Sequence, residues 1–295
     1  MSRIKLSLGY DTERPYGEWA ETEKGKEFRL KQIDFVRKMN GVLNLAGVPR
    51  THYILGNYLE RCTDTMSIKD LREVYDVNNS LMELQQHSYS HPIFRPTKEG
   101  DKSVISAQEF IFDVDRAKKV IFDITGAVTN GLRTPRGYDR DLSDIPEILN
   151  GLTELGFNFV SSDLRSSDSI DGPFTKERQP HSYKNAGYPK IIEMPSHGWQ
   201  DAIFIPAYKE KFLLPGQTLD NPLVHYEGLF NQARKMSEET GKNSYISLCM
   251  HPWCMMEWDK DLEIHKSLIE KARNNKIEIV SYGTAAKEIF QSENI

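Results

Sequence analysis

Short apolar runs alternate with longer amphipathic stretches along the whole chain. Residues 4–8 alternate apolar and polar side chains with a period of two, which predicts a strand. Residues 30–43 repeat apolar side chains at close to helical spacing, which predicts a helix that ends at Gly47. The pattern continues to the C-terminus. It predicts strands at 4–8, 52–55, 82–84, 128–132, 157–160, 191–194, 245–250 and 277–280, separated by helices that include 106–125, 142–155, 222–240 and 262–274.

This alternation of strands and helices predicts a parallel sheet, because parallel strands need a crossover connection. The Gly-x-Gly-x-x-Gly fingerprint is absent after the first strand, which disfavours a dinucleotide-binding fold. No linker, charge run or repeat divides the chain. We therefore expect one α/β domain over 1–295, closed into a (β/α) barrel. In such a barrel the reactive side chains lie at the C-terminal ends of the strands.

Composition narrows the class of protein. The chain has 295 residues and 43 acidic against 38 basic side chains, a net charge of −5, which disfavours a nucleic-acid partner bound through a basic face. No stretch approaches the roughly 20 apolar residues of a membrane helix, and no secretory signal is visible. The three cysteines do not form a disulfide framework, and we expect Cys249 and Cys254 to be ordinary buried thiols. A cytoplasmic enzyme is expected.

Two strand ends carry residues that suit a metal site. Asp11 and Glu13 follow the first strand, and His87 and His91 follow the third. Two histidines four residues apart can present both imidazoles to one ion if the segment makes a helical turn. Two imidazoles and a carboxylate suit Zn²⁺ or a similar ion with one position left open. Asp11 or Glu13 can supply the carboxylate, and the other is then free to act as a base.

Three other strand ends carry candidate residues. Arg133 beside an ionised Asp would lower the carboxylate pKa and hold its rotamer, although alone it could be a surface arginine. Asp163 ends the fifth strand and could be a loop or capping residue. His251 ends the seventh and is either a site residue or a core histidine. Residues 197–201 follow the sixth strand and form either a substrate loop or an ordinary turn. No Gly-x-Ser-x-Gly elbow is present, which disfavours a serine hydrolase.

In order along the chain, these motifs resemble the polysaccharide deacetylase family, the NodB-homology or carbohydrate esterase family 4 type. The resemblance runs from about residue 6 to residue 282. It is carried by Asp11-Thr12-Glu13, His87-Ser-Tyr-Ser-His91, Arg133-Thr-Pro-Arg-Gly-Tyr138, Asp163 and His251-Pro252. It implies a distorted (β/α) barrel of seven or eight strands with a divalent metal, zinc or alternatively cobalt, manganese or nickel. It also implies hydrolysis of N-acetyl groups or related amides on sugars.

The resemblance implies roles for the first two motifs. Asp11 corresponds to the catalytic base, and Arg133 to the arginine that orients it. Glu13 stands where many members have a metal-binding Asp, and His87 and His91 match the two metal histidines. Because Glu replaces Asp here, the reverse assignment stays open, with Asp11 as the ligand and Glu13 as the base.

The later motifs imply an acid and a substrate pocket. His251 corresponds to the general acid, and Asp163 to the carboxylate that tunes it. The backbone N–H of Arg136 falls where the family has an oxyanion donor, and the Arg136 side chain replaces the usual Tyr or Phe and adds charge to the cleft. Substrate-binding side chains are expected at Arg136, Tyr138, Trp19 and Trp253.

The expected function is therefore metal-dependent deacetylation or deformylation of an N-acyl sugar. We expect the sugar to be a small molecule or linked to a lipid or nucleotide, and the enzyme to be a candidate homo-oligomer. Two alternatives remain open. One is a cytoplasmic amidohydrolase of the same fold that acts on ureides. The other is a catalytically silent sugar-binding barrel, in which Glu13 and Arg136 mark lost activity.

Overall fold

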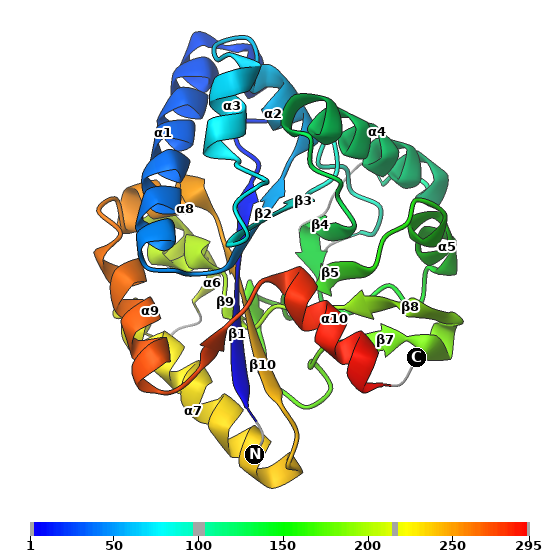
Figure 1. Ribbon diagram of the computed structural model, residues 1–295, viewed down its shortest axis with the longest axis vertical. Coiled ribbons are helices and arrows are strands. Elements are labelled where there is room, and N and C mark those ends of the chain that lie inside the picture. The colour runs from blue at the N-terminus through cyan, green and yellow to red at the C-terminus, as the bar shows by residue number, and fades with distance from the viewer. Residues whose placement is uncertain (1–2, 97–103, 214–217, 294–295) are drawn as a thin grey trace.

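The computed structural model describes residues 3–96, 104–213 and 218–293, and its main sheet is built mostly from parallel strands (Figure 1). The strand order is β10-β1-β2-β3-β4-β5-β8-β7, and every neighbouring pair from β10 to β8 is parallel. The bounds of the parallel strands are β1 (Ile4–Thr12), β2 (Arg50–Ile54), β3 (Met82–Gln86), β4 (Gly131–Tyr138), β5 (Phe159–Asp163), β8 (Tyr188–Glu193) and β10 (Ser244–Met250).

Four shorter strands complete the sheets. β7 (His181–Tyr183) pairs antiparallel with β8, and β11 (Glu278–Ile279) pairs parallel with the first half of β1. β6 (Asp171–Gly172) and β9 (Gly198–Trp199) form a separate antiparallel pair. Each of the eight predicted strands has a counterpart, which confirms the α/β class with a parallel sheet. β6, β7 and β9 were not predicted.

Backbone pairing among the described residues does not join β8 to β10, so the sheet is not a fully closed barrel. Isolated hydrogen bonds from His197 and Gln179 satisfy part of this edge of β10 instead. The His197 N–H donates to the Ser247 carbonyl over 2.8 Å, and the Ser247 N–H donates to His197 Nδ1 over 3.1 Å. The side-chain Oε1 of Gln179 accepts from the Tyr245 N–H at 2.9 Å. The expected distortion of the barrel lies at this junction.

Helices surround the sheet, with α1, α7 and α9 near β1 and β10, and α4 and α5 near β4 and β5 (Figure 1). None of the helices in the described ranges has the length and apolar character that crossing a membrane requires. Their bounds are α1 (Glu23–Leu45), α2 (Gly56–Cys62), α3 (Ile68–Val74), α4 (Ala107–Thr125), α5 (Pro146–Glu154), α6 (Pro206–Phe212), α7 (Pro222–Thr240), α8 (Pro252–Trp258), α9 (Glu263–Asn274) and α10 (Tyr282–Ser292). Short 3-10 turns occupy η1 (Gly17–Glu21), η2 (Lys184–Ala186) and η3 (Asp201–Phe204).

Local signals set the ends of the long helices. Ser106 caps α4 through a reciprocal capping box with Glu109, and Gly126 ends the helix with a φ of 81°. Asn221 caps α7, and Pro222 occupies its first turn as the sequence predicts. α5 begins at Pro146 rather than at 142.

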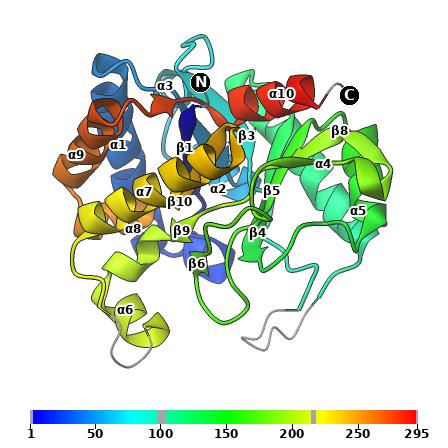
Figure 2. The ribbon, with the colours of Figure 1, turned by 90° about the horizontal axis from the view of Figure 1, so that it is seen from below.

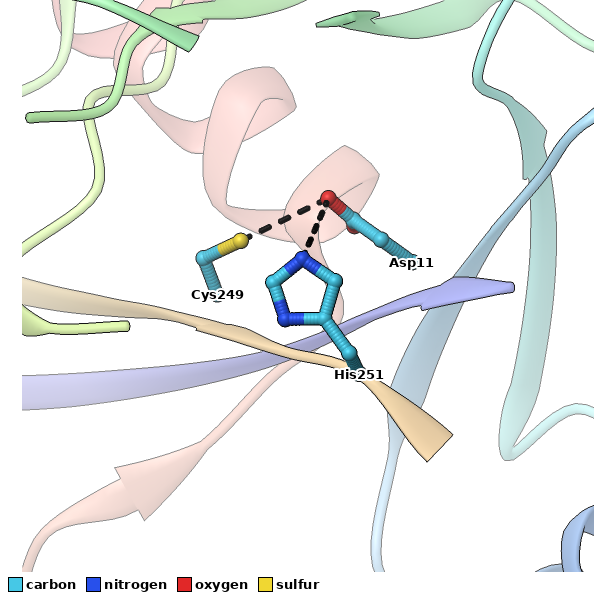
Figure 3. Close-up of side chains that lie close together, drawn as sticks. All are labelled: Asp11, Cys249 and His251. Carbon is cyan, nitrogen blue, oxygen red and sulfur yellow. Dashed lines mark hydrogen bonds and ion pairs between the residues drawn. The ribbon is translucent and has the colours of Figure 1, made fainter. Parts of the chain in front are cut away.

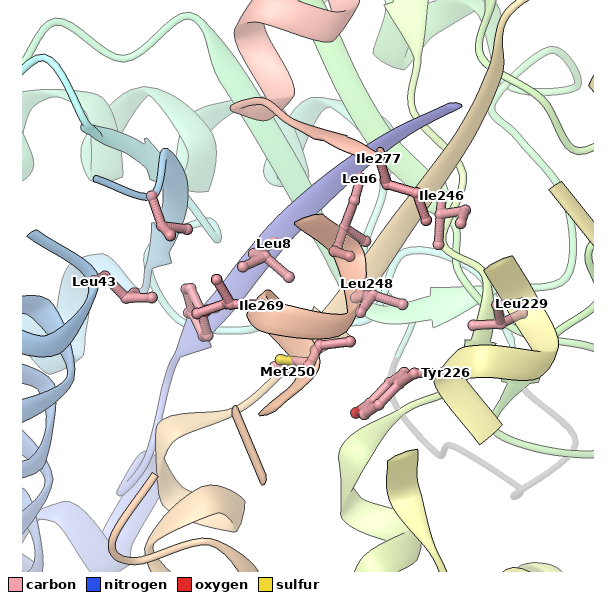
Figure 4. Packing of buried hydrophobic residues seen from close by; sticks show 14 of the residues in the cluster. Leu6, Leu8, Leu43, Tyr226, Leu229, Ile246, Leu248, Met250, Ile269 and Ile277 are labelled. Atoms are coloured by element: carbon pink, nitrogen blue, oxygen red, sulfur yellow. The ribbon is translucent and has the colours of Figure 1, made fainter. Parts of the chain in front are cut away.

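The largest apolar cluster lies between β1, β10 and the helices outside them (Figure 4). Leu6 and Leu8 of β1 and Leu248 of β10 are almost fully buried there. They pack in one cluster with Leu43 of α1 and Ile269 of α9. Because side chains alternate along a strand, the other face of β1 points into the barrel. That face carries the residues that lead to Asp11.

Figure 2 shows the two chain ends on the opposite side of the molecule from α6 and β6. The chain enters β1 at Ile4, so the side that carries the termini is the amino end of the parallel strands. The carboxyl ends therefore open toward α6, as the position of a barrel-type site requires.

Candidate active site

Three side chains meet at the carboxyl ends of β1 and β3. Glu13 Oε2 lies 2.8 Å from His91 Nε2 and 3.3 Å from His87 Nε2. The ligand atoms that these residues offer all lie within 4.8 Å of one another. A single ion could therefore contact all three.

The two histidines are oriented by the backbone around them. His87 Nδ1 donates to the Arg133 carbonyl over 2.9 Å, which leaves Nε2 to face Glu13. The segment from His87 to His91 is not a helical turn, contrary to the expectation. Ser88 and His91 instead adopt left-handed φ values of 64° and 60°. The Asp113 carboxylate of α4 holds this turn by accepting from the Tyr89 N–H at 2.7 Å.

The charge state of the three residues suits a divalent ion. Burial alone raises the pKa of Glu13, but His91 and His87 outweigh it and hold that pKa well below its usual range. Burial lowers the pKa of His91 despite the neighbouring carboxylate, which favours the neutral imidazole that binds metals. A carboxylate and two imidazoles match the donor set of open zinc sites.

Two other clusters in the described residues combine a carboxylate, a histidine and a cysteine. One contains Asp11, Cys249 and His251, and the other contains Asp201 and Cys254 with the same histidine. Burial raises the pKa of both thiols well above the ordinary range, which disfavours the thiolate form that binds metals. The geometry therefore favours Glu13, rather than Asp11, as the carboxylate that shares an ion with the two histidines.

Asp11 lies beside this triad and is held by a buried arginine. Arg133 Nη1 donates to Asp11 Oδ1 over 2.7 Å, and both side chains are almost fully buried. The Arg133 guanidinium lies 4.2 Å from the centre of the Tyr53 ring. Gly9 leaves room for it, because a Cβ there would come within 2.7 Å of Arg133 Nη2. The interior of the barrel therefore fixes the rotamer of Asp11.

The second oxygen of Asp11 faces Cys249 and His251 (Figure 3). The Cys249 thiol donates to Asp11 Oδ2 over 3.4 Å, and His251 Nε2 lies 3.9 Å from the same oxygen. His251 Nδ1 donates to Asp201 Oδ1 over 2.7 Å, and its backbone N–H donates to Asp201 Oδ2 over 2.9 Å. Burial alone lowers the pKa of His251, but Asp201 and the other nearby carboxylates raise it to about 9.

The expected pairing of Asp163 with His251 is wrong, because Asp201 occupies that position. Asp163 Oδ1 instead forms an ion pair with Arg178, with 2.7 Å between Oδ1 and Nη1. Asp201 ends the loop 197–201, which the sequence marked only as a substrate loop or an ordinary turn. No spacing in the sequence identifies it as the partner of His251. The chain reaches this position because residues after β8 bond to β10 through His197.

Asp11, Glu13, His87, His91 and His251 line a cavity of about 160 Å³. Arg136 also lines it, from a bulge at the end of β4 where its φ is 71°. Trp253 lines it and donates from Nε1 to Glu13 Oε1 over 3.3 Å. Tyr138 and Trp19 do not line this cavity, contrary to the expectation. Tyr138 is buried against Phe94, with ring centres 4.9 Å apart. Trp19 of η1 packs on Phe28 of α1.

Sequence reasoning missed other residues that line the cavity. They are Arg14, Tyr16, Arg165, Tyr208 and Lys211. The ring of Tyr16 stacks on His91, with ring centres 4.9 Å apart. Arg14 directly follows Glu13 and Arg165 closely follows β5, so their positions beside strand ends could have marked them. Tyr208 and Lys211 lie in α6, which showed no usable periodicity.

Comparison with known proteins links this site to one family. The family model described as polysaccharide deacetylase matches residues 32–160, which include His87, His91 and Arg133. A search of curated protein sequences finds no match. The family match supports the resemblance to polysaccharide deacetylases, and a polysaccharide deacetylase domain indicates a hydrolase that acts on carbon–nitrogen bonds.

Solved structures share the fold. An inferred polysaccharide deacetylase from Mycobacterium smegmatis is 16% identical, with a TM-score of 0.62 over 99% of this chain and 92% of that one. A protein from Pseudomonas aeruginosa PAO1, also assigned to the polysaccharide deacetylases, is 14% identical, with a TM-score of 0.59 over 97% and 90%. The PuuE allantoinase is 13% identical, with a TM-score of 0.60 over 97% and 90%.

Proposed function

We propose that this polysaccharide deacetylase-like chain is a metal-dependent amide hydrolase that removes an acetyl or formyl group from the nitrogen of an N-acyl sugar. One observation carries the proposal. The Glu13–His87–His91 triad lines the same cavity as Asp11 and His251, which pair with Arg133 and Asp201 behind the cavity wall. A ligand set, a carboxylate base and an imidazole acid are the three groups that this chemistry requires.

The triad would hold a divalent ion, zinc by its donor set or alternatively cobalt, manganese or nickel. When bound, such an ion lowers the pKa of water and polarises an amide carbonyl. His87 is already oriented for this role by the Arg133 carbonyl. Trp253 supports Glu13 through its second oxygen.

Asp11 is the proposed base. Arg133 takes one of its oxygens, which leaves Oδ2 to accept a proton from water in the cavity. The buried ion pair keeps the carboxylate in one orientation. Its Oδ2 lies 4.0 Å from His87 Nε2, so the base adjoins the proposed ion site.

His251 is the proposed acid. A pKa of about 9 keeps its imidazole protonated near neutral pH, and it can pass that proton to the departing amine nitrogen. Asp201 holds Nδ1, so Nε2 is the atom that donates. The backbone N–H of Arg136 is the proposed oxyanion donor, supported by its place in the bulge that borders the cavity.

The test is release of acetate or formate from N-acetyl and N-formyl sugars by metal-loaded protein. Metal-stripped protein and the D11N and H251A variants are the controls. We expect turnover only by the loaded wild type. Loaded protein that releases neither acid from a broad panel would contradict the proposal and favour a silent barrel.

A second candidate is hydrolysis of a small ureide. The cavity volume of about 160 Å³ favours it, since typical ligand pockets hold about 300–1,000 Å³. An allantoinase also shares the fold. Ureides in the same panel separate the two candidates, because they would be cleaved while N-acyl sugars are not.

A further inference from the structure

Four positively charged side chains line the proposed active-site cavity: Arg14, Arg136, Arg165 and Lys211. They come from four separate segments, namely the loop after β1, the bulge of β4, the loop after β5, and α6. The whole chain carries a net charge of −5. The cationic lining is therefore local to the cavity and does not follow from the composition.

The carboxylates that line the cavity already have partners, and one of those partners is Arg14 of the same lining. Among the described residues that line it, the carboxylates are Asp11 and Glu13. Asp11 is paired with the buried Arg133, and Glu13 contacts two imidazoles. A divalent ion at the triad would add further positive charge. An anionic group on a substrate would be attracted to a lining of this kind.

Arg14 is held at the cavity wall by several contacts. Its guanidinium lies 4.0 Å from the centre of the Trp253 ring, and Nη2 donates to the Tyr208 hydroxyl over 3.3 Å. Its Nε lies 4.0 Å from Glu13 Oε1. The side chain is 30% exposed, so it keeps access to the cavity. An arginine fixed in this way is suited to bind a carboxylate or phosphate.

The aromatic residues in the cavity offer little stacking surface for a neutral sugar. One face of Trp253 is covered by Arg14, and Tyr16 is stacked on His91. Tyr208 and Phe212 lie beside each other, with ring centres 6.2 Å apart. Charged groups, rather than aromatic faces, therefore dominate what the cavity presents.

A second, smaller cavity adjoins the first at Arg165. It holds about 110 Å³ and is lined by Arg95, Arg140, Ser166 and Ser167, with Asp139 as its acidic residue. Arg95 and Arg140 share Asp144 as an ion-pair partner. The cationic lining thus continues past Arg165, on the side of β4 and β5.

We infer that the substrate carries an anionic group, a carboxylate or a phosphate, that binds to the cationic lining of this cavity while the amide lies at the triad. This inference rests on the proposed function, because it identifies the class of substrate for the same site. Either anion suits guanidinium and ammonium donors, and the two are distinguished by experiment.

The experiment compares matched substrates. Metal-loaded wild type is assayed on N-acetylglucosamine, N-acetylglucosamine 6-phosphate and N-acetylmuramic acid, which are neutral, phosphorylated and carboxylated. We expect kcat/KM to be about tenfold or more higher for at least one anionic sugar than for the neutral one, as one charge-assisted contact provides. The preferred anionic sugar shows whether a phosphate or a carboxylate is bound. Equal or better hydrolysis of the neutral sugar would overturn the inference and leave the proposed function intact.

Variants locate the effect. K211Q and R165Q should each reduce the preference for the anionic sugar by about tenfold, because each removes a charged contact. K209Q is the matched control. It removes the same charge from α6, but Lys209 does not line the cavity and pairs with Asp220. A preference that K209Q reduces as much as K211Q does would refute a localised site.

Calorimetry gives a readout independent of turnover. Wild type should bind N-acetylglucosamine 6-phosphate or N-acetylmuramic acid more tightly than N-acetylglucosamine, and high salt should reduce the difference. One outcome is that the wild type cleaves no amide and still binds the anionic sugars more tightly than N-acetylglucosamine. If K211Q then loses that difference in affinity, the proposed function fails and the anion site stands. If the three sugars bind equally, the inference fails.

Discussion

Replacing Asp201 by Asn should change the pH dependence of catalysis in a defined direction. Asp201 accepts from both the side chain and the backbone of His251, at 2.7 and 2.9 Å. Its charge is the largest influence that raises the pKa of His251 from 6.5 to about 9. Asn keeps the size of the side chain and removes the charge. Burial then dominates, and the pKa of His251 should fall to 6.5 or below.

The magnitude follows from that pKa. At 1.36 kcal/mol per pKa unit, the carboxylates around His251 favour its protonated form by about 3 kcal/mol net of burial. At about pH 8, an imidazole with a pKa of about 9 is roughly 90% protonated, whereas one with a pKa of 6.5 is about 3% protonated. A general acid acts only when protonated. We therefore expect kcat of D201N to be about thirtyfold lower than wild type near pH 8, with a much smaller deficit near pH 6.

The assay measures kcat for acyl release between about pH 5 and 10. The alkaline limb of this pH–rate profile, where kcat falls, reports the pKa of the general acid. D201N should move that limb to lower pH. D163N is the matched control, because Asp163 pairs with Arg178 and should leave the limb in place. A D201N deficit that is uniform with pH, or an unmoved limb, would refute the reasoning.

Three further predictions test other parts of the site. H91A should lose bound zinc in equilibrium dialysis while C249S keeps it, and equal zinc in both would contradict the choice of ligands. R133M should lower the free energy of unfolding in urea by about 3–5 kcal/mol, because Asp11 would remain buried without its arginine counter-charge; a wild-type urea midpoint would contradict this. G9A should lower both Tm and kcat without releasing zinc, because its Cβ would displace Arg133, and a wild-type profile would show that the barrel interior adapts.

The strands were predictable where apolar side chains recur over several residues. β4 shows the limit of that signal. The predicted strand ends at 132, yet the backbone continues to Tyr138 through Pro135 and Gly137, residues that usually interrupt strands. A shift in register between Arg133 and Tyr138 accommodates them. Strands of two or three residues, such as β6, β7 and β9, are too short to show a period.

Most of the site was predictable because the carboxyl ends of neighbouring parallel strands meet at one edge. Asp11 and Glu13 lie at the carboxyl end of β1 and His87 follows β3, with β2 between the two strands, so their proximity follows from the order of the sheet. The partner of His251 was not predictable in the same way. It depends on the path of the loop after β8, which crosses the open junction to β10 before it reaches Asp201. That path is set by tertiary contacts rather than by local pattern.

The most direct test of this account is anomalous diffraction from crystals of the protein grown with zinc. We predict one strong peak at about 2.0–2.2 Å from Glu13, His87 Nε2 and His91 Nε2 together, the distances of zinc to carboxylate oxygen and imidazole nitrogen. A zinc peak between Asp11, Cys249 and His251, or none at the triad, would contradict the central claim that these three residues form the metal centre of a hydrolase.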